Sequence, residues 1–132
     1  MQILHYLMEK PRLIVIEDDE FLAHAYQQFL RKTPYEVSII RDGAEAIKAI
    51  WELKPHLIIL DLILPHVTGI EILRTLRGNP TTASIPIIIA SNIDSVETKD
   101  ECNKLGIQGY FIKSNISLQE LSDLCQKYLR ST

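Results

Sequence analysis

Short apolar segments bounded by charged or turn residues recur along the chain, and several of them are rich in Ile and Val. Segments of this length and composition are typical of strands in a sheet that is covered on both faces. The pattern predicts five strands, at residues 13–16, 35–40, 56–60, 85–90 and 110–112.

Between these strands, apolar residues recur every three or four positions, which is the spacing of one face of an α-helix. Gly78, Asn79 and Pro80 follow the third such stripe and act as helix stop signals. The three stripes are Phe21, Leu22, Ala25, Tyr26, Phe29 and Leu30; Ala46, Ile47, Ile50 and Trp51; and Ile70, Leu73 and Leu76.

The last two helical segments differ in how much apolar surface they carry. The final segment begins with a capping box, Ser117 and Glu120, and continues with leucines at helical spacing up to Leu129. The segment before it, residues 95–105, is mostly polar, so we expect its helix to be thinly packed. Its only candidates for burial are Val96, Cys102 and Leu105.

Strands that alternate with helices at this spacing predict right-handed βαβ crossovers. The expected fold is therefore an α/β domain built on a doubly wound, five-stranded parallel sheet. In open sheets of this kind, ligands bind outside the carboxyl ends of the strands, so we expect the functional residues at that edge.

Length and composition are those of one globular domain, with 132 residues of which 46% are hydrophobic and 23% charged. The pattern starts only at Arg12, so residues 1–10 are predicted to be an N-terminal extension and residues 11–132 the domain. The apolar start MQILHYLM lacks the basic region and cleavage site of a signal peptide. Because no segment is long enough to span a bilayer, we expect a cytoplasmic protein that does not bind membranes.

Charge and cysteine content exclude two further classes. The net charge is −3 and no cluster of Lys and Arg occurs, which argues against direct nucleic-acid binding by this chain. Cys102 and Cys125 lie far apart and outside any metal-ligand spacing, so both are expected to be reduced thiols.

Residues with chemical capacity follow four of the five predicted strands. Each one alone is an ordinary helix cap or solvated group, and Asp19 or Glu20 suits the N-cap of the next helix. Their convergence on one edge of the sheet is what indicates a site. The residues at these strand ends are Glu17, Asp18, Asp61, Ser91 and Lys113.

The acidic residues at this edge predict a bound cation. Carboxylates within a few ångströms repel each other unless one takes up a proton or a cation binds. Hard oxygen ligands with few His or Cys residues nearby favour Mg²⁺. Nucleotide-binding sites of such folds instead place glycines and a Walker lysine after the first strand, and both are missing here.

The same residues resemble the motifs of the response-regulator receiver domain, the phosphoacceptor half of two-component signalling. LIVIEDDE resembles the family's first strand and acidic pair, aligned on Glu17 and Asp18, and DLILPHVTG resembles the segment that starts with the phosphoacceptor, Asp61. The resemblance covers about residues 12–129 and implies the flavodoxin-like (βα)5 receiver fold. PIIIAS and GYFIKS add the hydroxyl of Ser91, the aromatic ring of Tyr110 and the ammonium of Lys113.

The resemblance implies that Asp61 accepts a phosphoryl group from a phosphohistidine on a sensor histidine kinase or phosphotransfer protein. Lys113 and the Ser91 hydroxyl would then neutralise charge on the phosphoryl oxygens, together with Mg²⁺. The implied magnesium ligands are Asp18, Asp61, the backbone carbonyl of Ile63 and, through water, Glu17.

A conformational switch is also implied. After phosphorylation, Ser91 would move toward Asp61, and Tyr110 would turn inward into the vacated space. The thinly packed helix at 95–105 would then alter the face that it forms with the last strand and the last helix. That face is expected to contact a downstream protein target or, after phosphorylation, a second copy of the chain.

Several positions depart from the commonest family pattern without removing the nucleophile or a ligand. Ser114 stands where a proline usually follows the lysine, which puts the family's cis peptide bond in doubt here. Ser91 replaces the commoner Thr, and Thr68 stands where Asp or Ser is frequent. Ile63 and Ile93 are apolar at positions that affect attack by water in the family, which predicts slow autodephosphorylation.

The leading hypothesis is a stand-alone receiver, because 132 residues leave no room for an output domain. It would assist its own phosphorylation and dephosphorylation and would not be an enzyme with a separate substrate. A second hypothesis is a constitutive protein-interaction module with the same fold. A third, a metal-dependent phosphatase, would need a second acid two residues after Asp61, where Ile63 stands.

Overall fold

The computed structural model describes residues 10–129 and contains one sheet of five parallel strands in the order β2-β1-β3-β4-β5. Every predicted strand overlaps an observed one, and the doubly wound topology is confirmed. The strands are β1 (Arg12–Ile16), β2 (Glu36–Ile40), β3 (Leu57–Leu60), β4 (Ile87–Ser91) and β5 (Gly109–Ile112).

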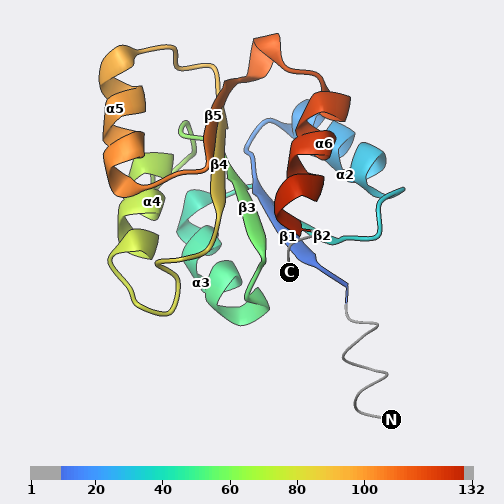
Figure 1. Ribbon diagram of the computed structural model, residues 1–132, viewed down its shortest axis with the longest axis horizontal. Coiled ribbons are helices and arrows are strands. Elements are labelled where there is room, and N and C mark those ends of the chain that lie inside the picture. The colour runs from blue at the N-terminus through green and yellow to red at the C-terminus, as the bar shows by residue number, and fades with distance from the viewer. Residues whose placement is uncertain (1–9, 130–132) are drawn as a thin grey trace.

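Helices cover both faces of the sheet (Figure 1). On one face lie α2 and α6, and on the other lie α3, α4 and α5. Their bounds are α2 (Glu20–Leu30), α3 (Gly43–Leu53), α4 (Gly69–Arg77), α5 (Val96–Leu105) and α6 (Leu118–Leu129), and a short 3-10 turn, η1 (Lys113–Asn115), joins β5 to α6.

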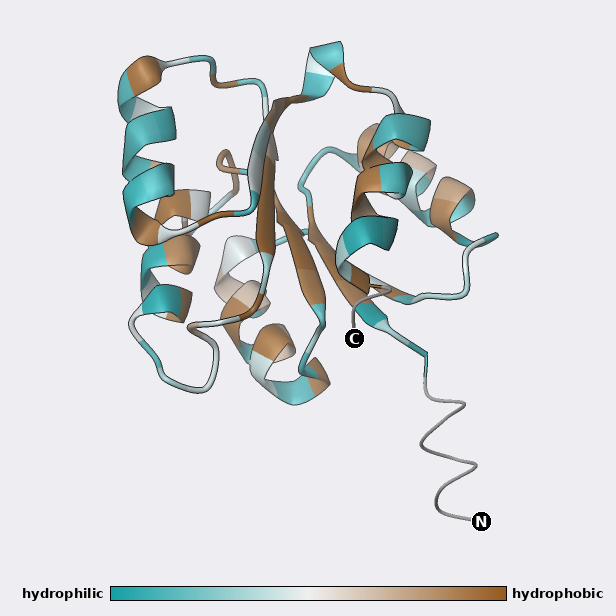
Figure 2. Cartoon of the chain, in the orientation of Figure 1, coloured by the Kyte–Doolittle hydropathy of each residue, from teal (hydrophilic) through white to brown (hydrophobic). Residues whose placement is uncertain are grey.

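The alternation of side chains along the strands builds two separate cores. In β1, Leu13 and Val15 pack with α2 and α6, whereas Ile14 and Ile16 pack with α3, α4 and α5. Successive side chains of a strand point to opposite faces, so a strand buried on both sides must be apolar throughout. Figure 2 shows this arrangement as hydrophobic strands between helices whose outer sides are hydrophilic.

Helix caps lie where the sequence signals them. Asp19 is the N-cap of α2, and its carboxylate accepts a hydrogen bond from the backbone N–H of Leu22 at 2.7 Å. The capping box of α6 is reciprocal: Ser117 Oγ accepts from the N–H of Glu120 at 3.1 Å, and Glu120 Oε1 accepts from the N–H of Ser117 at 3.2 Å. Gly78 is the C-cap of α4. These caps confirm the predicted ends of the three helices.

Three residues expected to be buried are instead exposed. Phe21 is 85% exposed, Val96 75% and Trp51 50%. Phe21 and Val96 lie in the first turns of α2 and α5, beyond the carboxyl ends of the strands, where the sheet offers no surface to pack against. Trp51 lies in the last turn of α3, at the opposite edge of the sheet. Helical spacing alone does not distinguish such end positions from central ones.

The expectation for α5 is confirmed, because Cys102 is its only buried residue. Cys125 in α6 is also buried, and both cysteines are free thiols. Besides Cys102, only the partly buried Leu105 of α5 packs on the core, and the N-cap Ser95 and surface ion pairs such as Arg74 with Glu101 add little. This helix is therefore the most weakly anchored helix of the domain.

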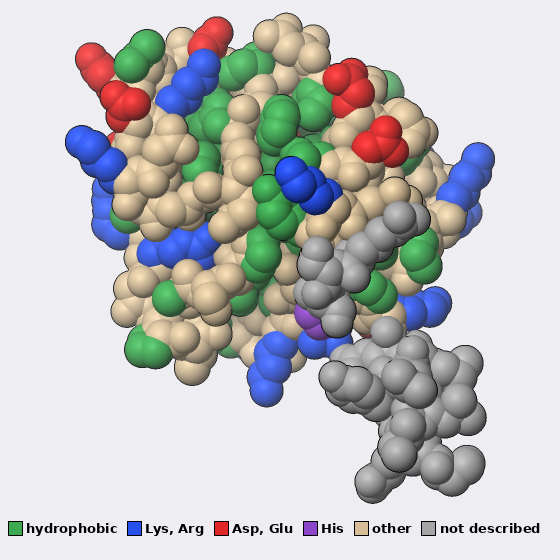
Figure 3. Space-filling view, in the orientation of Figure 1, with side chains coloured by type: hydrophobic (Ala, Val, Ile, Leu, Met, Phe, Trp, Pro, Cys, Tyr) green, Lys and Arg blue, Asp and Glu red, His purple; other side chains and the backbone are tan. Residues whose placement is uncertain are grey.

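The N-terminal extension, apart from Lys10, lies outside the described residues, as do residues 130–132. Within residues 10–129, no helix is both long enough and apolar enough to cross a membrane. On the face drawn in Figure 3, Lys and Arg side chains are dispersed and form no single basic patch. The exclusion of nucleic-acid binding stays a prediction.

Candidate functional site

The carboxyl ends of the strands bring the predicted site residues to one edge of the sheet. Glu17 directly follows β1 and Asp61 directly follows β3, and both are almost completely buried, at 2% and 4% exposure. They open onto a cleft of about 230 Å³ at this edge. Its lining residues are Glu17, Asp18, Asp19, Asp61, Ile63, Asn92 and Lys113.

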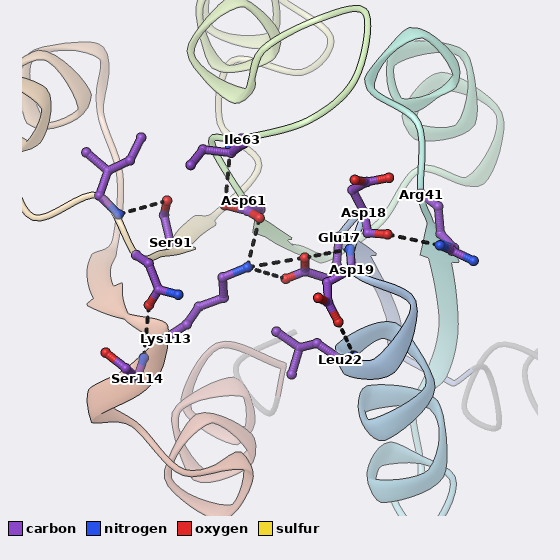
Figure 4. Close-up of polar contacts among 12 residues, drawn as sticks. Glu17, Asp18, Asp19, Leu22, Arg41, Asp61, Ile63, Ser91, Lys113 and Ser114 are labelled. Carbon is purple, nitrogen blue, oxygen red and sulfur yellow. Dashed lines mark hydrogen bonds and ion pairs between the residues drawn. The ribbon is translucent and has the colours of Figure 1, made fainter.

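Lys113 supplies a positive charge between the two buried carboxylates. Its Nζ donates to Glu17 Oε1 and to Asp61 Oδ2, each at 2.9 Å (Figure 4). The side chains of these three residues are only 16% exposed or less. Buried charges persist only when they are paired, so this bridge explains how a buried strand can end in acidic residues.

Burial and pairing act in opposite directions on the charges of this cluster. Burial raises the pKa of the Glu17 carboxyl; the Lys113 hydrogen bond opposes the rise, and the neighbouring Asp61 adds to it. Burial also opposes the charge of Lys113, but hydrogen bonds to Asp61 and Glu17 outweigh it and raise the pKa of the ammonium. Lys113 is therefore firmly cationic, while burial is the largest influence on the pKa of Glu17.

Close backbone packing fixes the position of Asp61. Gly69, at the start of α4, lies so near that a Cβ there would be 2.3 Å from the Asp61 carbonyl oxygen. The N–H of Gly69 also donates to the carbonyl of Leu62 at 3.0 Å. The Asp61 carboxylate itself accepts from the N–H of Ile63 at 3.3 Å. Glycine at 69 is thus a steric requirement for this loop, which carries both Asp61 and Ile63.

The residues expected to bind Mg²⁺ line one cleft and offer hard oxygen donors, which fits the ion. They do not form a closed cage: in the part of the chain that the structure describes, no three acidic, His or Cys side chains converge as ready-made ligands. Asp18 is exposed, lies beside Arg41 in Figure 4, and accepts from its Nη2 through the backbone oxygen at 3.0 Å. Magnesium typically uses one or two carboxylates and several waters, so an open site suffices.

The two switch residues lie on neighbouring strands, β4 and β5, and both contact Ile93. Ser91 ends β4 and is fully buried, and its Oγ accepts from the N–H of Ile93 at 3.3 Å. The Tyr110 hydroxyl donates to the carbonyl of Ile93 at 2.6 Å, and the Lys99 ammonium lies 5.7 Å from the centre of its ring. Burial is the main cause that raises the pKa of Tyr110 to about 12, so this hydroxyl remains a donor at neutral pH. Ile93 thus links the two switch residues.

Sequence reasoning missed two contacts at this edge. Asn92 lines the cleft, and its Oδ1 accepts from the backbone N–H of Ser114 at 3.1 Å. His66, in the loop after Asp61, contacts the Asp42 carboxylate at 3.1 Å. A hydrogen bond from the Ala44 N–H lowers the pKa of Asp42, and His66 adds to the effect. The Ser-for-Pro departure at 114 was the one available signal for the first contact, because only a non-proline residue donates there.

Comparison of the sequence with known protein families identifies the family of this chain. The response regulator receiver domain family matches residues 13–126, nearly the whole chain. The chain belongs to this family. The resemblance inferred from the acidic pair, Asp61, Ser91 and Lys113 is thereby confirmed, and so is the receiver fold.

Individual relatives agree with this assignment. The DNA-binding response regulator MtrA of Mycolicibacterium smegmatis is 35% identical over 89 residues, covering 67% of this chain and 38% of MtrA. The chain therefore spans well under half of that relative. The receiver domain of a protein assigned as a LuxO repressor from Vibrio parahaemolyticus superimposes with a TM-score of 0.84 and 30% identity, covering 93% and 92% of the two chains. The phosphorylated cyanobacterial phytochrome response regulator RcpA superimposes with a TM-score of 0.84 and 26% identity. The alignment covers 94% of this chain and 97% of the RcpA chain.

Proposed function

We propose that this domain accepts a phosphoryl group on Asp61 from a phosphohistidine of a histidine kinase or phosphotransfer protein, with Mg²⁺ as cofactor. The observation that supports it most is the buried Asp61 carboxylate, which opens onto a cleft and contacts the Lys113 ammonium at 2.9 Å. The solved structure of the phosphorylated relative RcpA supports the same assignment.

The proposed transfer is an in-line displacement at phosphorus. A carboxylate oxygen of Asp61 forms a bond to phosphorus while the P–N bond of the phosphohistidine breaks, and the departing imidazole nitrogen keeps the electron pair. Lys113, already held by Glu17, remains beside the equatorial oxygens as charge builds on them. Asp18, Asp61 and the Ile63 carbonyl would hold Mg²⁺, which would supply the remaining neutralisation.

The signal would leave through the α5-β5-α6 face. Ser91 would move from the Ile93 N–H toward the phosphoryl group, and Tyr110 would change its packing beside it. Because α5 buries only Cys102, it can follow at small energetic cost. The recipient would be a downstream protein or a second phosphorylated copy. The domain would assist its own phosphorylation and dephosphorylation without acting on a separate substrate.

The alternative is a constitutive interaction module, and one observation favours it. The Lys113 ammonium already contacts both Glu17 and Asp61, each at 2.9 Å, so part of their charge is neutralised without a metal or a phosphoryl group. The intact set of nucleophile, acids, hydroxyl and lysine favours the phosphoacceptor over this alternative.

The test is the intact mass of the protein after incubation with a small-molecule phosphodonor and Mg²⁺. We expect one added phosphoryl group in the wild type, and none in Asp61→Asn or after chelation of the metal. Asp61→Asn keeps the size of the side chain but removes the nucleophile, and its fold is checked by circular dichroism. A folded wild-type protein that takes up no phosphoryl group would favour the constitutive module.

A further inference from the structure

Asn92 occupies the cleft above Asp61 but has no role in the function proposed above. It follows Ser91 at the end of β4 and lines the cleft together with Asp61 and Lys113. A side-chain amide at this place can donate two hydrogen bonds and accept others. Which of its ends faces the cleft decides whether it attracts or repels a phosphate.

The structure fixes that orientation. Asn92 Oδ1 accepts a hydrogen bond from the backbone N–H of Ser114 at 3.1 Å. A backbone N–H can only donate, so the oxygen of the amide must face Ser114 and the NH₂ group must face away from it. Among residues 10–129, no group accepts a hydrogen bond from this NH₂. The donor end of Asn92 is thus left for a ligand or for water.

We propose that Asn92 is a further catalytic residue, whose side-chain NH₂ donates a hydrogen bond to a phosphoryl oxygen on its way to Asp61, and that Ser114 is the positioning residue that orients it. This inference rests on the proposed function of Asp61 as a phosphoacceptor. Lys113 and the Ser91 hydroxyl would act from inside the protein, where both are largely buried, whereas Asn92 is exposed and would act from the solvent side of the cleft.

Ser114 can play this part because it has a backbone N–H. A proline at 114 would remove the donor, and the amide of Asn92 would then be free to turn its oxygen toward the phosphoryl group. The peptide bond between Lys113 and Ser114 is trans, as are all peptide bonds within residues 10–129. Asn92 and Ser114 therefore act as a pair that joins the end of β4 to η1.

The experiment measures the rate of phosphorylation by acetyl phosphate, and separately the Mg²⁺ affinity without any phosphodonor. Asn92→Leu keeps the size of the side chain and removes its donors. We expect its rate to fall about tenfold, the usual effect of losing a hydrogen bond to a charged group at a partly solvated site. Its Mg²⁺ affinity should stay within about twofold, because Asn92 is not among the proposed ligands. General damage to the cleft would change both quantities.

Ser114 is tested with a matched pair of variants. Ser114→Ala keeps the backbone N–H and serves as the reference for Ser114→Pro, which removes the N–H and should be phosphorylated at least about threefold more slowly than Ser114→Ala. In Asn92→Leu, adding Ser114→Pro should cause no further loss, since the second residue acts only through the first. Thermal unfolding identifies any variant that does not fold, and Asn92→Asp, expected to be slower than Asn92→Leu, provides an independent test.

The outcomes separate the two proposals. If the wild type is not phosphorylated, the proposed function fails and this inference fails with it. If the wild type is phosphorylated and Asn92→Leu reacts at the same rate, the phosphoacceptor assignment survives and the role of Asn92 is overturned. Equal and independent losses from Asn92→Leu and Ser114→Pro would overturn the positioning role of Ser114 alone.

Discussion

Replacement of Lys113 by methionine is the sharpest test of how the site is held together. Lys113→Met keeps the length of the side chain but removes the charge that pairs Glu17 and Asp61. At 2.9 Å and an effective dielectric constant of about 20, each contact is worth about 6 kcal/mol before the cost of desolvation. After that cost, breaking a buried pair by removing one partner typically destabilises a protein by about 3–5 kcal/mol.

The loss should depend on pH in a defined direction. Burial and Asp61 already raise the pKa of Glu17 above its ordinary value of 4.5, and removal of Lys113 takes away the larger of the two contacts that oppose the rise, leaving the Asp19 backbone N–H. A carboxyl whose pKa is higher in the folded than in the unfolded state stabilises the fold at low pH, and that stabilisation is lost as pH rises through the folded pKa. Destabilisation by Lys113→Met should therefore be about 3–5 kcal/mol at pH 7 and smaller at pH 5.

The assay is urea unfolding of the metal-free protein at both pH values, with Lys48→Met as the control. The side chain of Lys48 is 82% exposed and pairs with Glu52 at 3.9 Å, so its replacement should change stability by less than about 0.5 kcal/mol. Added Mg²⁺ should restore part of the stability of Lys113→Met at pH 7 if it binds the two carboxylates. A loss below about 1 kcal/mol, or an equal loss at pH 5 and pH 7, would refute the electrostatic account.

Three further predictions concern the backbone and the switch. Gly69→Ala should destabilise the domain by about 3 kcal/mol in urea unfolding, because its Cβ would lie 2.3 Å from the Asp61 carbonyl oxygen. The control Gly78→Ala should have little effect, and similar losses from the two variants would contradict the packing argument. Ser95→Ala removes the hydroxyl that accepts from the Thr98 N–H and should lower the free energy of unfolding by about 1 kcal/mol. Amide hydrogen exchange should then be faster in α5 than in α3, and equal exchange in the two helices would contradict this prediction. The exposed, apolar Ile63 predicts slow loss of phosphate, so the half-life of the phosphorylated protein should be minutes or longer and should shorten in Ile63→Asn; a half-life of seconds in the wild type would disprove this.

The sequence predicts the fold well because burial on both sides leaves little ambiguity in the strands. A run such as Leu13–Ile16 has no polar alternative, and parallel pairing then follows from the helices between the strands. The main errors concern burial of Phe21, Trp51 and Val96. Their helical spacing is correct, but they lie at helix ends, where no side chain of the core packs against them. Periodicity indicates the direction of a side chain and does not indicate how far the sheet extends beneath it.

The site was predictable as far as topology determines it. The carboxyl ends of parallel strands share one edge, so Glu17, Asp61 and Lys113 had to approach each other. The sharing of one ammonium by two carboxylates was not predictable, because it depends on distances of a few tenths of an ångström. The contact between Asn92 and Ser114 was equally hidden, since it joins residues 22 positions apart through a single backbone N–H.

The Lys113 bridge also has a consequence for the order in which the chain matures. The contact with Glu17 spans 96 positions and the contact with Asp61 spans 52, so both form only after β5 has joined the sheet. During synthesis, β1, β2 and β3 leave the ribosome with two acids that must be buried and no cation to pair them. The last strand thus completes the pairing of these charges, and a chain that lacks β5 has Glu17 and Asp61 without the Lys113 ammonium. The stability that these two contacts supply is therefore gained only when the C-terminal part of the domain packs onto the sheet.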